Sequence, residues 1–412
     1  MSESQGSREF DVIVWGATGF TGTLVAEYLL RQYGVGGSLR WAIAGRSQEK
    51  LDGLRESLGV KGGDLKTIVA DSFDRDALDA LAQRTRVVLT TVGPYALYGS
   101  DLVQACVEAG THYCDLAGEV QWIRKMIDQH HERAQQTGAR IVHCCGFDSV
   151  PMDIGVWFLQ EEAQKRFGQY CKSITLLVKA TKGAASGGTI ASMMNLIEES
   201  RKDRAIARIL VDPYSLNPAG ERQGPDRRDQ QNVAYQDNAE SWTAPFVMAG
   251  VNTKVVRRSH ALAGYPYGKD FQYQEAVMTG QGVTGWLKGA TMTLGIGGLV
   301  LGASFAPTRK LLQRFVLPEP GEGPDRKLQE SGFFNLMQIG VLPNGTLLQS
   351  RITGDQDPGY GSTSKMLSEC AVCLAKDELA VGGGVWTPAS AMGGPLLERL
   401  QKNAGLTFEI RD

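Results

Sequence analysis

The sequence has little net charge and little histidine. Its 43 Lys and Arg nearly balance its 45 Asp and Glu, for a formal net charge of −2, and five residues are histidine. Such a chain has no overall positive field that would recruit nucleic acid or acidic lipid. Apolar residues make up 42% and charged residues 21%, an ordinary globular mixture that excludes wholesale disorder.

A secretory signal and an even set of cysteines are also lacking. The first nine residues are polar and contain no apolar signal core. The cysteines number seven, which is odd. These features favour a reduced, cytoplasmic protein over a disulfide framework. We expect residues 1–9 to form a disordered tail.

Glycine, by contrast, is abundant. The chain has 50 glycines and 15 prolines, whereas average usage near 7% would give roughly 29 glycines in a chain of this length. The excess shows no regular repeat, so the positions of the glycines carry the information.

Residues 10–150 alternate short apolar runs with helical patterns. The β-rich run Phe10–Trp15 precedes helical spacing over Phe20–Tyr33, and the alternation continues to a last run at Arg140–Cys145. Strands alternating with helices of this length predict βαβ units. The fold class expected is therefore α/β, with a Rossmann-type doubly wound parallel sheet of about six strands.

After Pro151 the pattern changes to separated strand candidates, such as Ser173–Ala180 and Gly345–Gly354. Residues 151–356 are expected to form a second, α+β domain for substrate binding or dimerisation, with a mostly antiparallel sheet and a polar loop over 212–241. Helices within 357–412 are expected to pack back on the first domain and complete it.

A glycine-rich loop stands where the first strand gives way to a helix. The glycines suit a tight turn, a close backbone approach to a pyrophosphate, and close packing of the helix on the sheet. The helix N-terminus adds N–H groups and the positive end of a dipole. A purely structural turn is the alternative. The predicted nucleotide-binding residues of this loop are Gly16, Ala17, Thr18, Gly19, Phe20, Thr21 and Gly22.

The end of the second strand indicates which nucleotide is bound. An NAD site usually places a carboxylate there to hold the ribose 2′-hydroxyl. Here Arg46 and Ser47 occupy that place, with Lys50 following. A guanidinium suits a 2′-phosphate, whereas a carboxylate would repel it. NADP(H) is therefore predicted, although a solvated arginine at a helix start is the alternative.

Residues after the third and fourth strands complete the predicted cofactor site. Asp71 is placed to meet the adenine edge or, equally, to cap a helix. Val92, Gly93 and Pro94 would pass beside the ribose and nicotinamide, because ligands of open α/β sheets lie outside the carboxyl ends of the strands. Tyr95 is a candidate proton donor, with packing as its alternative role.

Several motifs together resemble one family, the saccharopine dehydrogenase-like oxidoreductases. They are GATGFTG (16–22), AGRS (44–47), TVGPYALYG (91–99), THYCDLAGE (111–119), GFDSVPMDIG (146–155), DPGYGSTSKM (357–366) and GGGVWTPASAMG (382–393). The likeness is specific at both ends and thin between about 200 and 340. It is closest to the lipid-associated branch, which includes trans-acting enoyl reductases. The resemblance implies a Rossmann domain, an inserted α+β domain and NADP(H), and leaves the substrate open.

Hydride transfer requires no protein nucleophile, because the cofactor carries the chemistry. A proton donor is then sought at the expected nicotinamide edge. Asp115 closes the fifth strand, and Asp148 and Ser149 follow the sixth. Both Asp148 and Ser149 are also favoured N-cap types for the helix that follows, which is their alternative role.

No metal site is predicted. His143, Cys144 and Cys145 are consecutive on a strand, so their side chains alternate between its faces. Cys370 and Cys373 lack a second cysteine pair and lie in a helical pattern. Neither set suits a tetrahedral zinc site.

A second concentration of glycine lies in the uncharged segment 289–308, which includes Gly298-Leu-Val-Leu-Gly302. Its length just suffices to span a bilayer, but Thr291, Thr293 and Ser304 dilute it. A peripheral membrane or lipid contact is favoured, with a buried or homodimer contact next and a true span last.

The sequence thus predicts an NADP(H)-dependent oxidoreductase acting on an apolar acyl substrate, by reduction of an enoyl or keto group. One alternative is a non-catalytic NADP-binding protein of lipid or membrane surfaces. Another is a saccharopine-type amino-acid dehydrogenase. A homodimer is expected, and nucleic acid is not expected as a partner.

Overall fold

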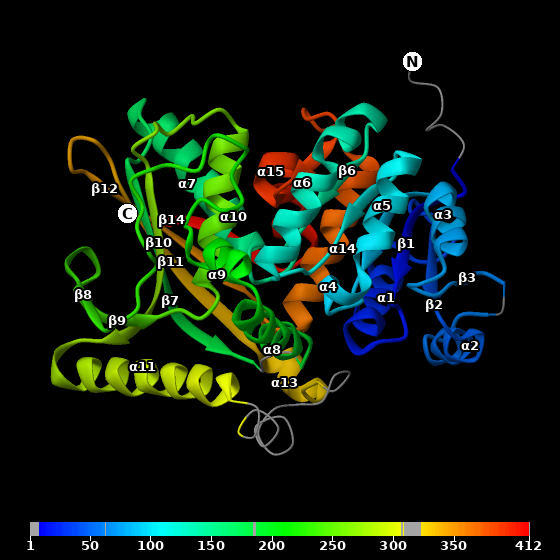
Figure 1. Ribbon diagram of the computed structural model, residues 1–412, viewed down its shortest axis with the longest axis horizontal. Helices are drawn as coiled ribbons and strands as arrows, with labels where there is room; N and C mark the ends of the chain where they lie inside the picture. Colours follow the sequence, from blue (N-terminus) through cyan, green and yellow to red (C-terminus); the bar gives the residue numbers. More distant parts are fainter. Residues whose placement is uncertain (1–7, 62, 184–186, 306–307, 309–322, 412) are drawn as a thin grey trace. The chain divides into compact units, whose positions relative to one another are not determined.

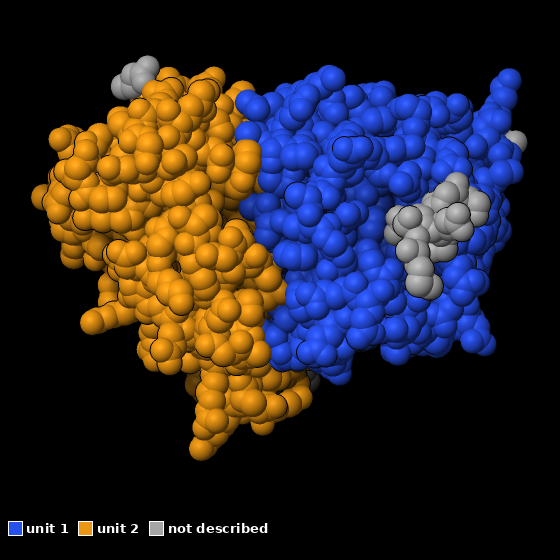
Figure 2. All heavy atoms as spheres, turned by 90° about the horizontal axis from the view of Figure 1, so that it is seen from above, with its two compact units in different colours: residues 1–147, 360–404 blue, residues 148–359, 405–412 orange. Residues whose placement is uncertain are grey.

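The computed structural model describes residues 8–61, 63–183, 187–305, 308 and 323–411. Its contacts divide the chain into two compact units, coloured in Figure 2. Unit 1 comprises Met1–Phe147 and Tyr360–Ala404, and unit 2 comprises Asp148–Gly359 and Gly405–Asp412. The chain therefore passes from unit 1 into unit 2, returns to unit 1 at Tyr360, and ends in unit 2.

Unit 1 holds a fully parallel sheet, which confirms the predicted Rossmann-like class. Its described strands, in spatial order, are β13 (Gly384–Trp386), β6 (Arg140–Val142), β5 (His112–Cys114), β4 (Thr85–Thr90), β1 (Phe10–Trp15), β2 (Trp41–Gly45) and β3 (Lys66–Val69). The sheet has seven described strands where about six were expected. The additional strand, β13, comes from the C-terminal segment and is too short to show an alternating pattern of apolar residues in the sequence.

The helices of unit 1 pack in two groups. One group joins α1, α14 and α15, and the other joins α3, α5 and α6. The described helices are α1 (Phe20–Tyr33), α2 (Gln48–Ser57), α3 (Arg75–Arg84), α4 (Tyr95–Tyr98), α5 (Ser100–Ala109), α6 (Val120–Thr137), α14 (Gly361–Lys376) and α15 (Pro388–Asn403). Figure 1 shows α14, from the end of the chain, running among the N-terminal elements.

A buried carboxylate ties this C-terminal helix pair to α1. Glu369 of α14 accepts hydrogen bonds from the hydroxyls of Tyr28 and Tyr33, both at 2.7 Å. It also accepts from Asn403 of α15 at 3.2 Å, and Arg399 lies 3.4 Å away. Glu369 is fully buried, and its hydrogen bonds link α14 and α15 to α1, which lies far from them in the sequence.

Unit 2 holds a mixed sheet that is mostly antiparallel, as predicted. Its described strands, in spatial order, are β14 (Leu406–Arg411), β12 (Leu347–Gly354), β11 (Phe333–Val341), β7 (Ser173–Lys182), β10 (Gln272–Gly280), β9 (Ser241–Pro245) and β8 (Ala234–Gln236). Only β7 and β10 of these run parallel. Residues 405–412, which were expected in the first domain, instead supply an edge strand of this sheet.

Helices of unit 2 pack on this sheet at several places. α7 and α10 contact each other, and α7 contacts β11, β12 and β14. The described helices are α7 (Val150–Phe167), α8 (Gly187–Lys202), α9 (Arg204–Val211), the short 3₁₀ helix η1 (Asp237–Ala239), α10 (Ala249–Leu262), α11 (Gly282–Ser304) and α13 (Arg326–Ser331).

Two expectations about irregular segments need correction. Residues 1–7 of the expected tail lie outside the described residues, and Arg8 is ordered, because it donates to the carbonyl oxygen of Ala82 at 2.6 Å. The loop 212–241 contains β8 and η1, and its Asp226 pairs with buried Arg257 at 2.6 Å. No described helix, α11 included, is long and apolar enough to cross a membrane. Residues 306–307 of the apolar segment lie outside the described residues.

The acid stability of unit 1 depends on Asp11 of β1, which is fully buried. Burial alone would raise its pKa, but ion pairs with Arg40 at 2.9 Å and Lys376 at 2.7 Å outweigh burial and lower the pKa to about 2. The unfolded value is about 3.9. The carboxylate therefore stabilises the fold above pH 4, and that contribution is lost as the pH falls from about 4 to about 2.

We predict that Asp11→Asn lowers the free energy of unfolding at pH 7 by about 1–2 kcal/mol, since Arg40 is partly exposed and the pair is partly screened. Urea unfolding followed by circular dichroism at a series of pH values checks this. The free energy of unfolding of the variant should fall less steeply below pH 4 than that of the wild type. An unchanged decline would contradict the assignment.

Candidate active site

The glycine-rich loop joins β1 to α1 at the carboxyl edge of the parallel sheet. The N–H groups of Gly16 and Ala17 donate to the carbonyl oxygen of Ala44 on β2, at 3.0 and 3.2 Å. From the other side, the Thr91 hydroxyl donates to the Gly16 carbonyl at 3.2 Å. The loop is therefore fastened to the strands on both sides of β1.

Two glycines of the loop are required by the protein itself. Gly16 has φ +85°, and a Cβ there would lie 2.5 Å from the Val92 Cγ2. A Cβ on Gly22 would lie 2.1 Å from the Gly16 carbonyl oxygen. The first turn of α1 therefore rests directly on the loop backbone, and no side chain fits between them.

Gly19 differs, because the protein leaves space beside it. It is the N-cap of α1, with φ −81° and ψ 166°, and no side chain caps this helix end. Gly19 is exposed, and a Cβ there would meet no heavy atom nearer than the Gly16 carbonyl oxygen at 3.4 Å. A bare, uncapped helix N-terminus fits a phosphate group, which accepts from its free N–H groups. The residues present thus fit the diphosphate of a dinucleotide.

Arg46 lies beside this loop. Gly45 ends β2, and its Cβ position is 3.6 Å from the Thr18 hydroxyl oxygen, so the two turns adjoin. Arg46 is exposed, and its guanidinium makes no hydrogen bond or ion pair with a described residue. Ser47 caps α2 by accepting from the N–H of Lys50 at 3.3 Å. The guanidinium is thus available for a phosphate group, since no carboxylate in the described part of the chain pairs with it.

The structure also places the other predicted cofactor residues at this edge. Val92 donates its N–H to the Thr90 hydroxyl at 3.2 Å, Gly93 is exposed, and Pro94 precedes α4. Asp71 follows β3, where its carboxylate accepts from the Phe73 N–H at 3.0 Å in a local turn. The cap of α3 is Asp74 instead, so the capping role considered for Asp71 is wrong.

Tyr95 is buried within unit 1, away from solvent. It is 5% exposed, its hydroxyl accepts from the Leu116 N–H at 3.1 Å, and its ring stacks on Trp122. Burial and then the nearby Asp115 raise the pKa of Tyr95 well above its usual value. These contacts favour the packing role for Tyr95 over proton donation.

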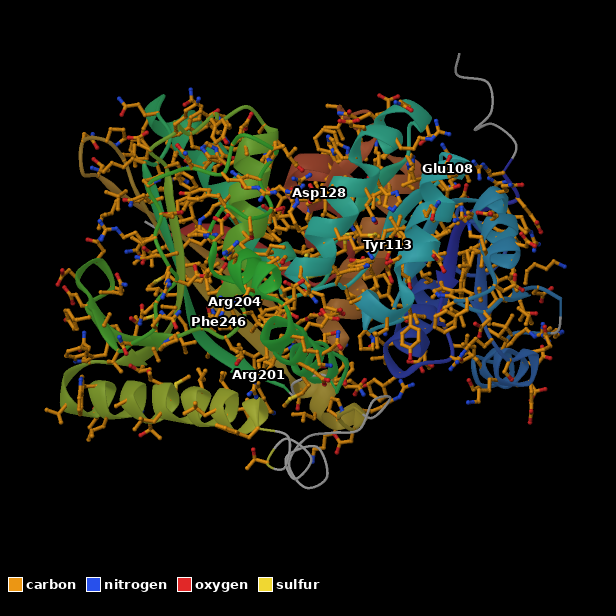
Figure 3. All side chains as sticks on the ribbon, viewed as in Figure 1. Glu108, Tyr113, Asp128, Arg201, Arg204 and Phe246 are labelled. Atoms are coloured by element: carbon orange, nitrogen blue, oxygen red, sulfur yellow. The ribbon has the colours of Figure 1, made fainter. Side chains whose placement is uncertain are left out.

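Asp115 is likewise engaged by the protein. One carboxylate oxygen lies 2.7 Å from His143 Nδ1 and accepts from the Tyr113 hydroxyl at 3.0 Å; Tyr113 is labelled in Figure 3. The other oxygen accepts from the N–H groups of Ala117 and Cys144, at 2.9 and 3.1 Å. Both carboxylate oxygens are hydrogen-bonded and the side chain is fully buried, so Asp115 joins β5 to the turn after β6.

Asp148 is the candidate acid with a free carboxylate. It is half-buried, and its carboxylate has no hydrogen-bond or ion-pair partner among the described residues. Burial raises its pKa to about 6. Asp148 follows Phe147, whose N–H donates to the Thr363 hydroxyl at 3.0 Å within unit 1. Chain connectivity thus keeps Asp148 next to a turn that is fixed after β6.

A hydrogen-bond chain behind Ser149 could not be read from the sequence. The Ser149 hydroxyl donates to Asn252 of α10 at 3.3 Å, and Asn252 donates to Glu275 of β10 at 3.0 Å. Burial raises the pKa of Glu275 to about 8. Ser149 stands at the N-cap of α7 but forms no side-chain cap there. Periodicity identifies Glu275 only as an inward strand position, without its partners.

Glu119, the last residue of the THYCDLAGE motif, has a structural role. Its two oxygens accept from the N–H groups of Tyr95 and Ala96, at 2.7 and 2.9 Å, so it caps α4. All seven cysteines are buried free thiols. Among the described residues, no group of three or more His, Cys, Asp or Glu side chains could hold a metal ion.

Comparison with known proteins identifies the class. Residues 12–142 match the family model of the saccharopine dehydrogenase NADP-binding domain. The yeast Saccharomyces cerevisiae saccharopine dehydrogenase (L-Glu forming) has a similar fold, with a TM-score of 0.54 and 11% identity over 98% of this chain and 99% of that chain. The glycine loop and Arg46 thus belong to a Rossmann domain that binds NADP(H), in an NADP-dependent oxidoreductase.

Similarity also extends along the whole chain to mycobacterial proteins. A Mycobacterium tuberculosis protein provisionally named as a trans-acting enoyl reductase is 41% identical, covering 98% of this chain and 97% of that protein. The trans-acting enoyl reductase of the same organism is 39% identical over 96% and 97%, and that of Mycobacterium leprae is 38% identical over the same shares. The chain belongs to the saccharopine dehydrogenase-like family, in the group that contains these proteins.

Gly19 and Gly22 provide a matched test of the phosphate site. Gly19→Ala should leave the urea midpoint nearly unchanged and weaken NADPH binding at least tenfold, because only the ligand needs that space. Gly22→Ala should lower the midpoint clearly, because its Cβ overlaps the Gly16 carbonyl oxygen. Urea unfolding and isothermal titration check both variants. If Gly19→Ala left the NADPH affinity unchanged, the proposed phosphate site at the N-terminus of α1 would be contradicted.

Arg46 is predicted to select the 2′-phosphate. Arg46→Ala should weaken NADPH at least tenfold and leave NADH affinity unchanged, since a charge-assisted contact to phosphate is lost. Lys66→Ala, an exposed cation on β3, is the control and should bind both nucleotides like the wild type. Isothermal titration with each nucleotide measures the preference. Equal wild-type affinities for the two nucleotides would refute the role of Arg46.

Proposed function

We propose that this chain reduces the carbon–carbon double bond of an enoyl group on an acyl, lipid-like substrate, with NADPH as reductant. Support comes from the full-length similarity to proteins named as trans-acting enoyl reductases. The carrying observation in the structure is Asp148, a half-buried carboxyl that has no partner among the residues the structure describes and whose pKa is raised to about 6.

The reaction requires a hydride at one carbon and a proton at its neighbour. When bound, NADPH supplies the hydride. The protein then has to hold a proton donor, and a carboxyl that is partly protonated near neutral pH meets that need. Asp148 is free to donate, whereas Tyr95 and Asp115 already use their polar atoms within the fold.

Ser149 is proposed to fix the position of this acid from behind, because its side chain is buried. Its hydroxyl donates to Asn252. Asn252 is in turn oriented by Glu275. This chain of contacts holds the start of α7, and with it the backbone next to Asp148, in one arrangement.

Oxidation of NADPH should therefore be fastest with acyl thioesters that carry a 2-enoyl group, compared with matched 3-keto thioesters and with 2-oxo acids plus an amine. Asp148→Asn should lower kcat about 100-fold without changing NADPH affinity. The acid must be protonated, so the wild-type rate should decline above about pH 6, and the variant should lose this decline. Asp64→Asn, an exposed carboxylate of unit 1, is the control.

Absorbance at 340 nm follows the reaction. Turnover of the keto or imine substrates in preference to the enoyl would contradict the proposed reaction. An Asp148→Asn variant with wild-type kcat and pH profile would instead exclude Asp148 as the proton donor and leave the reaction class intact.

A further inference from the structure

Helix α11 carries an unusual concentration of exposed apolar side chains. Four of them repeat at spacings of four and seven residues, which places them on one face: Val283 at 74% exposed, Leu287 at 52%, Leu294 at 76% and Leu301 at 64%. Trp286, Met292, Val300 and Phe305 are exposed as well. Scattered exposed apolar residues are normal, but a continuous apolar face marks a binding surface.

The opposite side of α11 is built for close packing within unit 2. Gly285 and Gly289 are buried. A Cβ on Gly285 would lie 2.2 Å from the Gly280 carbonyl oxygen, and one on Gly289 would lie 3.2 Å from Val233. These contacts draw the helix against β9 and β10 at the margin of unit 2 (Figure 1). Gly285 and Gly289 thus face the sheet, and the large apolar side chains spaced four and seven residues apart are exposed.

The charge carried by α11 itself has one sign, whereas the neighbouring α8 also carries Glu198 and Glu199. The sequence has no Asp or Glu between Glu275 and Glu319, and the charged residue within α11 is Lys288, which is exposed. At the other end of the helix, Arg201 of α8, labelled in Figure 3, lies over the Phe305 ring at 5.9 Å from its centroid. An acid-free apolar face with cations at both ends complements an anionic, apolar surface.

A second copy of the chain complements this face less well. An isologous dimer would set the same cations opposite each other and offer no α11 carboxylate to pair with them. An anionic lipid surface satisfies both features, because acyl chains receive the apolar side chains and headgroups receive Lys288 and Arg201. Trp286, 45% exposed on the same helix, suits the interfacial zone.

We propose that the outward face of α11 (Val283, Leu287, Leu294 and Leu301), with Phe305 just after the helix, docks unit 2 onto an anionic lipid surface, with the helix lying in the plane of the interface. Docking goes beyond the proposed reaction. It places an enzyme of acyl substrates where such substrates gather, and it does not require the enoyl chemistry to be correct.

The test is flotation of the full chain with vesicles of phosphatidylcholine mixed with phosphatidylglycerol, and with vesicles of phosphatidylcholine alone. Wild type should float with the mixed vesicles and much less with the neutral ones, and added salt should weaken binding. A variant with both Leu294→Glu and Leu301→Glu should lose roughly tenfold or more of its vesicle partitioning, since it removes two apolar insertions. Lys288→Glu should lose several-fold.

Leu347→Glu is the matched control, because Leu347 is 41% exposed on β12, away from α11 in the sequence. It should float like the wild type. NADPH affinity should be unchanged in every variant, which shows that unit 1 remains folded and separates this test from that of the reaction. Absence of wild-type flotation would overturn the proposal. So would equal flotation of the double variant, or a wild-type dimer, seen by sedimentation, that the double variant dissociates without any vesicle binding.

Discussion

The contact between α1 and the loop before it is the constraint on which the cofactor site depends. Gly22 rests on the carbonyl oxygen of Gly16, and Gly16 is itself pressed against Val92 of the segment after β4. Any side chain at either position would push the helix away from the sheet. This close approach brings the bare N-terminus of α1, at Gly19, to the carboxyl edge of β1. Arg46 then lies beside it, since Gly45 and Thr18 adjoin.

The return of the chain into unit 1 reinforces the same region. α14 packs against β1, β4 and β5, and Glu369 binds it to α1 through Tyr28 and Tyr33. At the start of the same helix, Tyr360 meets Phe20 of the glycine loop, with ring centroids 4.7 Å apart. The C-terminal residues therefore support the nucleotide site, although more than 200 residues of unit 2 intervene in the sequence.

Much of unit 1 could be predicted from the sequence, because its strands and helices alternate with clear periods. Phe10–Trp15 and Phe20–Tyr33 have the bounds that the pattern indicates. The three-residue strand β13 and the strand β14 could not be predicted, since long-range pairing defines them and local period does not. The same holds for the site. Gly16 and Gly22 can be recognised in the sequence, because the turn before the helix requires glycine. The hydrogen bonds that occupy Tyr95 and Asp115 cannot, because partners such as Leu116 and His143 are not revealed by any sequence spacing.

The central claim is that the edge formed by the glycine loop and Arg46 holds NADP(H) for a reduction. The most direct measurement is a crystal structure of the chain with NADP⁺. We predict the diphosphate at the N–H groups that follow Gly19, and the 2′-phosphate within hydrogen-bond distance of the Arg46 guanidinium. A nucleotide bound elsewhere, or a 2′-phosphate that faces solvent away from Arg46, would contradict this account.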